Sequence, residues 1–326
     1  MSGAAGGPAA AEVPVRPVEV VGEVRELHRS PEHLAAERFE VSVTVCFASN
    51  RDTLGETIAS LQRQRDAPPF ELLLVSNATH DDSVQVALEA ARGLPVRVVE
   101  CVSAGYDSNA RNVCMVESAA GKTLFLDSDD TVNEDYVAAM SAALDTSSMV
   151  TAVWDVRSIN AGRFPELAGA PAADPSRWPF RHQGWTFAPG GTLGFRREVP
   201  ERIGGFDRTL LFGANNEWCF RAFAAGHPIT AVPAAVVHYR LRPQARQALR
   251  QRYRWGASEV AAAKAAEGYG MPRRTGLRAA GAGTCARLLR RLATVRGSYD
   301  WYDFLSMLGQ AAGHVTGSVR HRRLDL

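Results

Sequence analysis

Short apolar runs alternate with stretches of helical periodicity from residue 40 to about residue 145. The apolar runs lie at residues 41–47, 70–75, 96–99 and 123–126, and the helical patterns lie at residues 53–64, 83–92, 106–120 and 134–144. Mostly apolar runs of this length are typical of strands that are buried on both faces. Strands that alternate with helices of about ten residues indicate βαβ units. The pattern therefore predicts an α/β fold built around a largely parallel sheet.

This alternation of strands and helices is absent before residue 39 and after about residue 148. Residues 1–38 open with Gly, Ala and Pro, which predicts a flexible N-terminal extension with at most one docked strand. Residues 149–195 are rich in Pro, Gly and Trp, which predicts loops and mixed strands around a site. After Pro243 the pattern is mainly helical. We therefore expect an α/β domain at residues 39–242 and a helical C-terminal extension at residues 243–326.

Composition places the chain among ordinary globular proteins. It has 326 residues, of which 46% are hydrophobic and 22% charged, enough for one large core or two smaller ones. The five cysteines are odd in number and lack zinc or redox spacing, which indicates reduced thiols. The sequence starts with no leader pattern and contains no apolar run of about 18 residues. These features predict a cytoplasmic protein without a membrane-spanning segment.

The net charge of +2 conceals a strong asymmetry. Residues 240–326 carry 17 Lys+Arg against 5 Asp+Glu, whereas residues 1–239 carry 20 against 30. A basic tail suggests an anionic partner: a phospholipid surface at the inner face of a membrane, a phosphorylated acceptor, or the acidic face of another subunit in a homo-oligomer. Residues 284–296 form a short basic amphipathic pattern that would lie on anionic lipid or pack on the body. Nucleic acid is not expected, because aromatic residues do not interleave with the basic ones.

Three carboxylates follow the last strand of the predicted sheet, in the sequence Asp127-Ser128-Asp129-Asp130. Ligands of α/β proteins gather at the carboxyl ends of the strands. Crowded carboxylates repel each other unless a cation or hydrogen bonds compensate. An Asp-x-Asp motif here suggests Mg²⁺ or Mn²⁺ that bridges the protein to substrate phosphates. The alternative is a solvated acidic turn, in which Asp130 or Asn133 caps the next helix.

Four segments in order resemble the inverting glycosyltransferases of family 2, which have the GT-A fold. They lie at residues 41–51, 71–83, 104–112 with 127–130, and 191–238. The resemblance implies a mostly parallel, twisted sheet flanked by helices, with a donor half at 39–148 and an acceptor half at 149–242. It also implies transfer of a sugar, of the hexosyltransferase type, from a nucleoside diphosphate sugar to a hydroxyl acceptor, with inversion and with Mg²⁺ or Mn²⁺.

The resemblance also assigns roles to residues. The donor would be bound by Phe47, Ala48, Ser49, Asn50, Ser76, Asn77, Arg111, Asp127 and Ser128, and the acceptor by Trp185, Gly191, Thr192 and Trp218. Asp129 would ligate the metal directly, Asp127 would face the ribose or the metal, and His238 would be a further ligand or a packed core residue. Ser76-Asn77 replaces the usual acidic pair, which leaves UDP, dTDP and GDP donors open.

One departure concerns the general base, usually the Asp of a Glu-Asp pair that here falls on Ala214-Asn215. An amide cannot accept the acceptor's proton, and a positioned base contributes about 10²–10⁴-fold in rate. We predict Glu217 as the base, although residues 215 and 217 point to nearly opposite sides of a regular helix. Glu217 could instead stabilise the helix N-terminus, with Asp155 or Asp207 as the base. An acceptor that needs no strong base is a further alternative.

Two other functions stay open at this point. The chain could bind a nucleotide sugar without catalysis, as a degenerate module. It could also be a nucleotidyltransferase, although residues 47–52 lack the Gly-rich basic loop that a triphosphate needs. Residues 251–255 match the Gln-x-x-Arg-Trp signature of membrane-embedded processive relatives. Without membrane spans, this signature indicates a basic helical segment near the diphosphate or the body.

Overall fold

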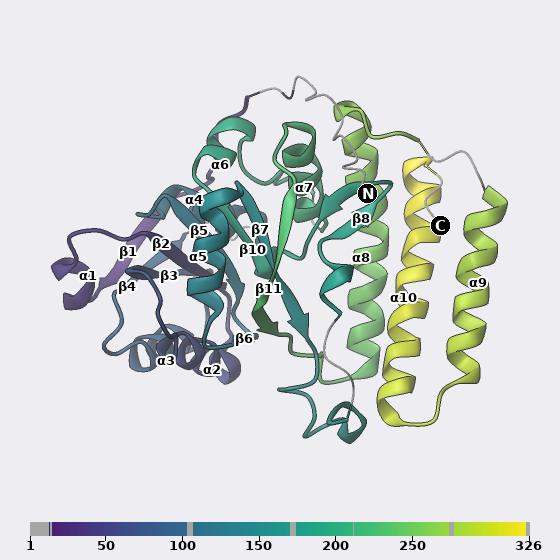
Figure 1. Cartoon of the computed structure of the whole chain (residues 1–326), viewed down its shortest axis with the longest axis horizontal. Coiled ribbons are helices and arrows are strands. Elements are labelled where there is room, and N and C mark those ends of the chain that lie inside the picture. The colour runs from purple at the N-terminus through teal and green to yellow at the C-terminus, as the bar shows by residue number, and fades with distance from the viewer. Residues whose placement is uncertain are drawn as a thin grey trace, which may run out of the picture.

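The structure is a computed structural model that describes residues 13, 15–102, 107–169, 174–210, 212–273 and 277–323. For residues 277–282 it describes the backbone alone. Its centre is a nine-stranded sheet in the order β1-β4-β3-β2-β5-β10-β7-β11-β6 (Figure 1). Gly105 of the third family-like segment, and the predicted start of a helix at Tyr106, lie outside the described residues.

The sheet is mostly parallel, as predicted. Its strands are β1 (Val24–Arg29), β2 (Val41–Phe47), β3 (Phe70–Asn77), β4 (Val96–Cys101), β5 (Lys122–Asp127), β6 (Thr131–Val132), β7 (Met149–Asp155), β10 (Leu193–Arg196) and β11 (Ile229–His238). Six of these nine run in one direction, and β1, β6 and β10 run in the other. A separate hairpin pairs β8 (Phe180–His182) with β9 (Trp185–Phe187). The predicted α/β fold is confirmed.

Helices cover both faces of the sheet. They are α2 (Arg51–Gln62), α3 (Ser83–Ala90), α4 (Asp107–Glu117), α5 (Tyr136–Thr146), α6 (Glu198–Ile203) and α7 (Ala214–Ala224). On β3, Leu72 and Leu74 belong to the core under α2, α3 and α5, whereas Leu73 and Val75 belong to the core under α4, α6 and α7. Successive strand residues point to opposite faces, so a continuous apolar strand serves two cores.

The N-terminal segment is joined to the sheet. The strand β1 pairs with β4 at the sheet edge, and α1 (Pro31–Ala35) follows it. Residues 24–29 thus form the single docked strand that the sequence allowed within its N-terminal extension. Ser30 caps α1 by accepting a hydrogen bond from the His33 backbone N–H at 3.2 Å.

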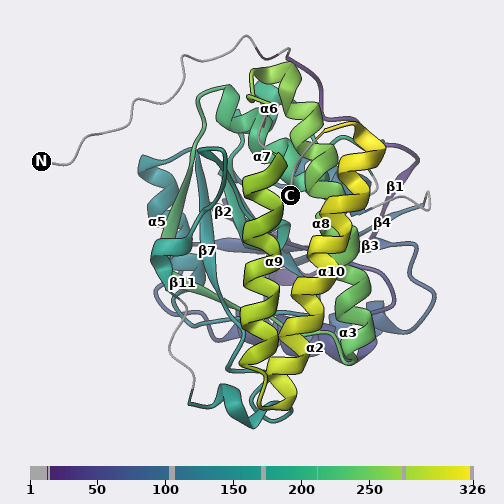
Figure 2. The same cartoon turned by 90° about the vertical axis from the view of Figure 1, so that its right-hand side faces the viewer.

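The C-terminal extension is helical, as predicted. It consists of α8 (Ala245–Ala266), α9 (Leu277–Ala293) and α10 (Ser298–His321), with α10 between the other two (Figures 1 and 2). Glycines let α8 and α10 approach closely: a Cβ on Gly313 would lie 2.1 Å from the Tyr253 carbonyl oxygen, and one on Gly256 would lie 2.2 Å from that of Gln310. Within the described part of the chain, no helix has the length and apolar character needed to span a membrane.

Candidate active site

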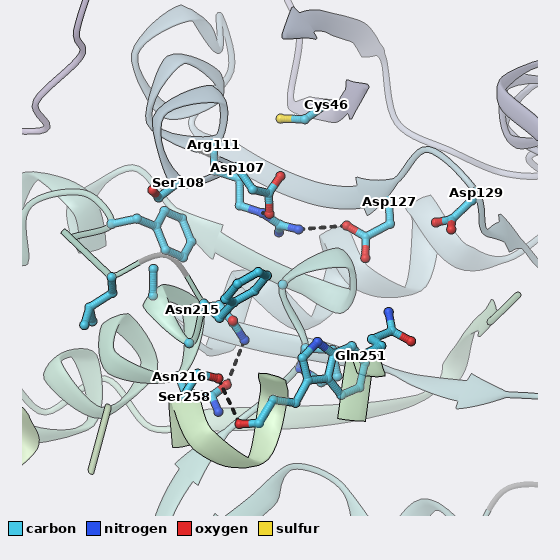
Figure 3. A pocket seen from close by; sticks show the side chains of 18 of the residues that line it. Cys46, Asp107, Ser108, Arg111, Asp127, Asp129, Asn215, Asn216, Gln251 and Ser258 are labelled. Carbon is cyan, nitrogen blue, oxygen red and sulfur yellow. Dashed lines mark hydrogen bonds and ion pairs between the residues drawn. The ribbon is translucent and has the colours of Figure 1, made fainter. Parts of the chain in front are cut away.

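A cleft of about 750 Å³ opens where the carboxyl ends of the parallel strands meet α7 and α8 (Figure 3). Of the residues predicted to bind the donor, the cleft is lined by Phe47, Ala48, Asn50, Asn77, Arg111, Asp127 and Ser128. The other two do not line it. The Ser49 hydroxyl accepts a hydrogen bond from the His80 backbone N–H at 3.2 Å, and the buried Ser76 hydroxyl donates to Thr79 at 2.9 Å.

The first carboxylate of the Asp-x-Asp motif is held by an arginine. The Arg111 Nη2 donates to Asp127 Oδ1 at 2.8 Å, and its Nε donates to Asp107 Oδ2 at 2.9 Å (Figure 3). Two glycines make room behind this pair: a Cβ on Gly190 would lie 2.2 Å from Arg111 Nη1, and one on Gly191 would lie 2.4 Å from Asp127 Cγ. Partial burial raises the pKa of Asp127, and the Arg111 charge opposes that shift. Gly191, predicted to bind the acceptor, therefore leaves the space that the Asp127 carboxylate occupies.

The other two carboxylates of the motif differ in environment. Asp129 lines the cleft, and its Oδ2 accepts from Arg242 Nη1 at 3.1 Å. Asp130 is buried, and its Oδ1 accepts from the Arg240 backbone N–H at 2.8 Å. Burial raises the pKa of Asp130 well above its ordinary value, with the Asp129 and Asp127 charges adding to the effect. Asp130 thus joins this loop to the segment that follows β11 and does not cap the next helix, whose N-cap residue is Asp135.

The carboxylates of the cleft suit a cation that is shared with a substrate. Among the described residues, no group of three or more His, Cys, Asp or Glu side chains is placed to hold a metal ion. Asp127 and Asp129 nevertheless offer oxygen ligands to the cleft. Mg²⁺ is commonly held by one or two carboxylates together with substrate phosphates and waters. His238 is not among the residues that line the cleft, and its Nδ1 lies 3.3 Å from Asp155 Oδ2.

The helix expected to carry the base begins beside the cleft. Asn215 lines the cleft, and its Nδ2 donates to the Ala188 carbonyl at 3.1 Å and to Asn216 Oδ1 at 2.8 Å (Figure 3). Gly213, the N-cap residue of α7, has φ 80°, a left-handed conformation that favours glycine. Asn215 therefore occupies a position at which a side chain can reach the cleft.

Glu217 lies on the other side of this helix. Its side chain is 2% exposed and accepts hydrogen bonds from Arg221 Nε at 3.0 Å and Nη2 at 2.8 Å. The Tyr269 hydroxyl donates to Glu217 Oε1 at 2.9 Å. Burial, with a contribution from the Glu217 charge, raises the pKa of Tyr269 to about 12, so this phenol stays a donor at neutral pH. The structure favours a buried ion pair over the catalytic base that the sequence suggested for Glu217.

Aromatic residues form part of the wall of the cleft. They include Trp154, Phe180, Phe187, Tyr239 and Trp255. Trp154 stacks on Tyr239 with ring centroids 4.4 Å apart. Sequence reasoning missed Trp154 and Tyr239 as cleft residues. A signal was present, since Trp154 lies near the end of one apolar strand and Tyr239 follows another.

The aromatic residues predicted to bind the acceptor lie in the core instead. Trp218 is fully buried and donates its Nε1–H to the Gly204 carbonyl at 2.8 Å. Trp185 is buried against Phe220 and Phe223. Thr192, from the same set, is buried, and its hydroxyl lies 2.9 Å from that of Thr151. The structure thus favours a packing role for all three.

The helix α8 closes the cleft. Gln251, Arg252 and Trp255, three residues of the Gln-x-x-Arg-Trp segment, line it together with Ser258 and Glu259. With its carbonyl turned toward Arg242, Gln251 accepts hydrogen bonds from that guanidinium at 3.1 Å. The C-terminal extension is therefore part of the site.

Comparison with known proteins identifies the family. Residues 38–258 match the family model described as glycosyltransferase like family 2, so the chain belongs to that family. The match reaches from just before β2 to the middle of α8, and it includes Asp127, Asp129 and Asn215. No curated protein matches the chain in sequence.

Solved structures confirm the GT-A fold. TarS residues 1–349 of S. aureus, in complex with UDP, is 14% identical with a TM-score of 0.52, over 87% of this chain and 92% of that chain. The same fragment in complex with UDP-GlcNAc gives 14% identity and a TM-score of 0.51, over 87% and 93%. The mannosyltransferase PcManGT of Pyrobaculum calidifontis, in complex with GDP-Man and Mn²⁺, is 17% identical with a TM-score of 0.56, over 93% and 90%.

Proposed function

We propose that the protein transfers a sugar from a nucleoside diphosphate sugar to a hydroxyl acceptor, with inversion and with Mg²⁺ or Mn²⁺. The observation that carries this proposal is the pairing of Asp127 with Arg111, and of Asp129 with Arg242, at one edge of the cleft. Carboxylates and guanidinium groups side by side suit a cation and a diphosphate together. The structures named above support a nucleotide-sugar donor, since TarS binds UDP-GlcNAc and PcManGT binds GDP-Man with Mn²⁺.

Each side of the cleft has a separate task in this proposal. Asp127 and Asp129 would hold the cation, which would supply positive charge to neutralise the leaving diphosphate. Arg111 and Arg242 can contact phosphate oxygens of the bound donor, which would compete with Asp127 and Asp129 for the two guanidinium groups. The aromatic wall offers flat faces to a sugar ring or an apolar acceptor group. The volume of about 750 Å³ lies within the range of about 300–1,000 Å³ that is common for small-molecule binding sites.

The transfer itself is a displacement at the anomeric carbon of the sugar. The acceptor oxygen forms a bond to that carbon on the face opposite the leaving group, which inverts its configuration. The bond to the diphosphate breaks, and the nucleoside diphosphate leaves with the electron pair. The hydroxyl proton passes to a base in the cleft.

The test is a thermal-shift screen of UDP, dTDP and GDP sugars, each with and without Mn²⁺, followed by an assay for the released products. A ligand at 100 times its Kd stabilises the folded protein by about 2.7 kcal/mol. Release of nucleoside diphosphate is the expected result. Binding without release would instead support a non-catalytic donor-binding module, and release of pyrophosphate from a nucleoside triphosphate would support a nucleotidyltransferase.

The C-terminal extension adds a partner to this proposal. In α9, Leu289 and Leu292 are exposed beside the exposed Arg287 and Arg290. Apolar and cationic side chains on one exposed helix suit the surface of an anionic membrane. We propose peripheral binding at the inner face of the membrane, with contact to another subunit of a homo-oligomer as the competing use of this surface.

A further inference from the structure

Glu259 is a carboxylate of the cleft to which the proposed chemistry gives no task so far. It lies on α8, directly after Ser258. A Cβ on Gly213 would lie 2.8 Å from the Ser258 carbonyl oxygen, so the start of α7 and this turn of α8 are in direct contact. Gly213 is two residues before Asn215. The contact therefore brings Glu259 to the side of the cleft where the family's usual base is replaced by an amide.

The Glu259 carboxylate is held in one orientation by two side chains of α10. Gln310 Nε2 donates to Oε1 at 2.8 Å, and His314 Nε2 lies 2.7 Å from Oε2. The Glu259 side chain stays 27% exposed. The two partners are four residues apart, which places them on the same face of one helix. Each carboxylate oxygen keeps lone-pair capacity for one more donor.

Glu259 also differs from the other carboxylates of the cleft in the side chain with which it forms an ion pair. Among the described residues, the cleft is lined by four carboxylates: Asp107, Asp127, Asp129 and Glu259. The three aspartates are paired with Arg111 or Arg242, which are permanently charged. The ion-pair partner of Glu259 is the imidazole of His314. Within the described part of the cleft, Glu259 is thus the one carboxylate that is not paired with an arginine.

We infer that Glu259 is the general base of the reaction, that it accepts the proton of the acceptor hydroxyl, and that Gln310 and His314 are positioning residues for it. This inference rests on the proposed transferase function. As the acceptor oxygen bonds to the anomeric carbon and the diphosphate leaves, the hydroxyl proton moves to a Glu259 oxygen. The resulting carboxylic acid returns the proton to water after the products leave. The base has thus moved from α7 to α8.

The decisive experiment compares Glu259→Gln with the wild type, using the full-length protein. The donors are UDP-GlcNAc, UDP-glucose and GDP-mannose with Mn²⁺, and release of nucleoside diphosphate is measured alongside donor Kd. Glu259→Gln should reduce turnover by roughly 10²-fold or more and leave the donor Kd unchanged, because the lost interaction belongs to the transition state. Glu89→Gln, which changes an exposed glutamate outside the cleft, is the matched control.

A second pair of variants decides the question if Glu259→Gln is too unstable to assay. His314→Ala keeps the carboxylate but removes one of its supports, and it should reduce turnover by about tenfold or more with the donor Kd unchanged. His314→Gln, whose amide can donate the same bond, should recover most of that loss. Recovery by the amide is not expected if His314 acts only as a proton carrier.

The outcomes separate this inference from the function on which it rests. Wild-type turnover in Glu259→Gln, or in His314→Ala, would overturn the assignment of the base. A wild-type protein that binds a donor with Mn²⁺ but releases no nucleoside diphosphate would also overturn it, and would leave the donor site standing. A wild-type protein that binds no nucleotide sugar would overturn the transferase proposal as a whole.

Discussion

Glu217→Gln separates stability from catalysis in this protein. The Glu217 carboxylate and the Arg221 guanidinium are each 2% exposed and share two hydrogen bonds at 2.8 and 3.0 Å. Removal of one partner from a buried ion pair costs about 3–5 kcal/mol, because the other charge is left uncompensated. A glutamine keeps one acceptor oxygen, and Arg221 retains bonds to the carbonyl groups of Ile203 and Gly205. We therefore expect a loss of about 3 kcal/mol, at the lower end of that range.

The assay is denaturant unfolding of the wild type, Glu217→Gln, Arg221→Met and the double variant. The double variant should be less destabilised than the two single variants together, because two side chains in direct contact are coupled. Turnover of Glu217→Gln, measured well below its unfolding transition, should stay close to wild type. This is the reverse of the expectation for Glu259→Gln, which should keep its stability and lose its rate.

The opposite pattern would refute this reasoning. If Glu217→Gln unfolds within about 0.5 kcal/mol of the wild type, the range of an ordinary surface substitution, and turnover falls by about 10²-fold or more, then Glu217 is the base. Its contacts with Arg221 and Tyr269 would then have to break during turnover. An unchanged stability and an unchanged rate would refute the ion pair without restoring the base.

Three further predictions concern the donor site and the tail. Asp129→Ala should abolish Mn²⁺-dependent binding of the nucleoside diphosphate while the fold survives; unchanged, metal-independent affinity in calorimetry would contradict the metal assignment. Gly191→Ala should weaken donor binding by about tenfold or more, since its Cβ would lie 2.4 Å from Asp127 Cγ and displace that carboxylate; wild-type affinity would show that Asp127 is not needed in this position. Co-sedimentation with anionic vesicles should fall steeply as salt rises and should be lost in a double variant with Leu289→Ser and Leu292→Ser; equal sedimentation with neutral vesicles would argue against anionic lipid.

The position of two carboxylates in the cleft was predictable because it depends on local sequence. Each apolar run ends at the edge of the sheet where ligands gather, so Asp127 and Asp129 could be placed at a site from strand position alone. Helix geometry also separated Asn215 from Glu217 correctly, since two residues along a helix correspond to a rotation of about 200°. The local sequence is therefore enough to predict the strand-end position of Asp127 and Asp129 and the opposite directions of Asn215 and Glu217.

The aromatic residues were harder to assign, because burial depends on which strands become neighbours. Trp154 and Tyr239 stack because β7 and β11 pair in parallel. These two strands are about 80 residues apart in the sequence. Trp218 has the same chemistry and a suggestive position in the chain, but it packs against Phe206 in the core. Residue type alone does not distinguish a cleft wall from a core.

The base was the least predictable residue, because three separate long-range contacts define its position. The helix α8 must lie along the cleft, and Gly213 must lie in close contact with Ser258. In addition, α10 must pack beside α8 so that Gln310 and His314 contact Glu259. None of these contacts has a local signature in the sequence. Position 215 carries an amide, and in this proposal the C-terminal extension supplies the base instead. On this reasoning, the helices after residue 243 are needed for turnover as well as for the shape of the cleft.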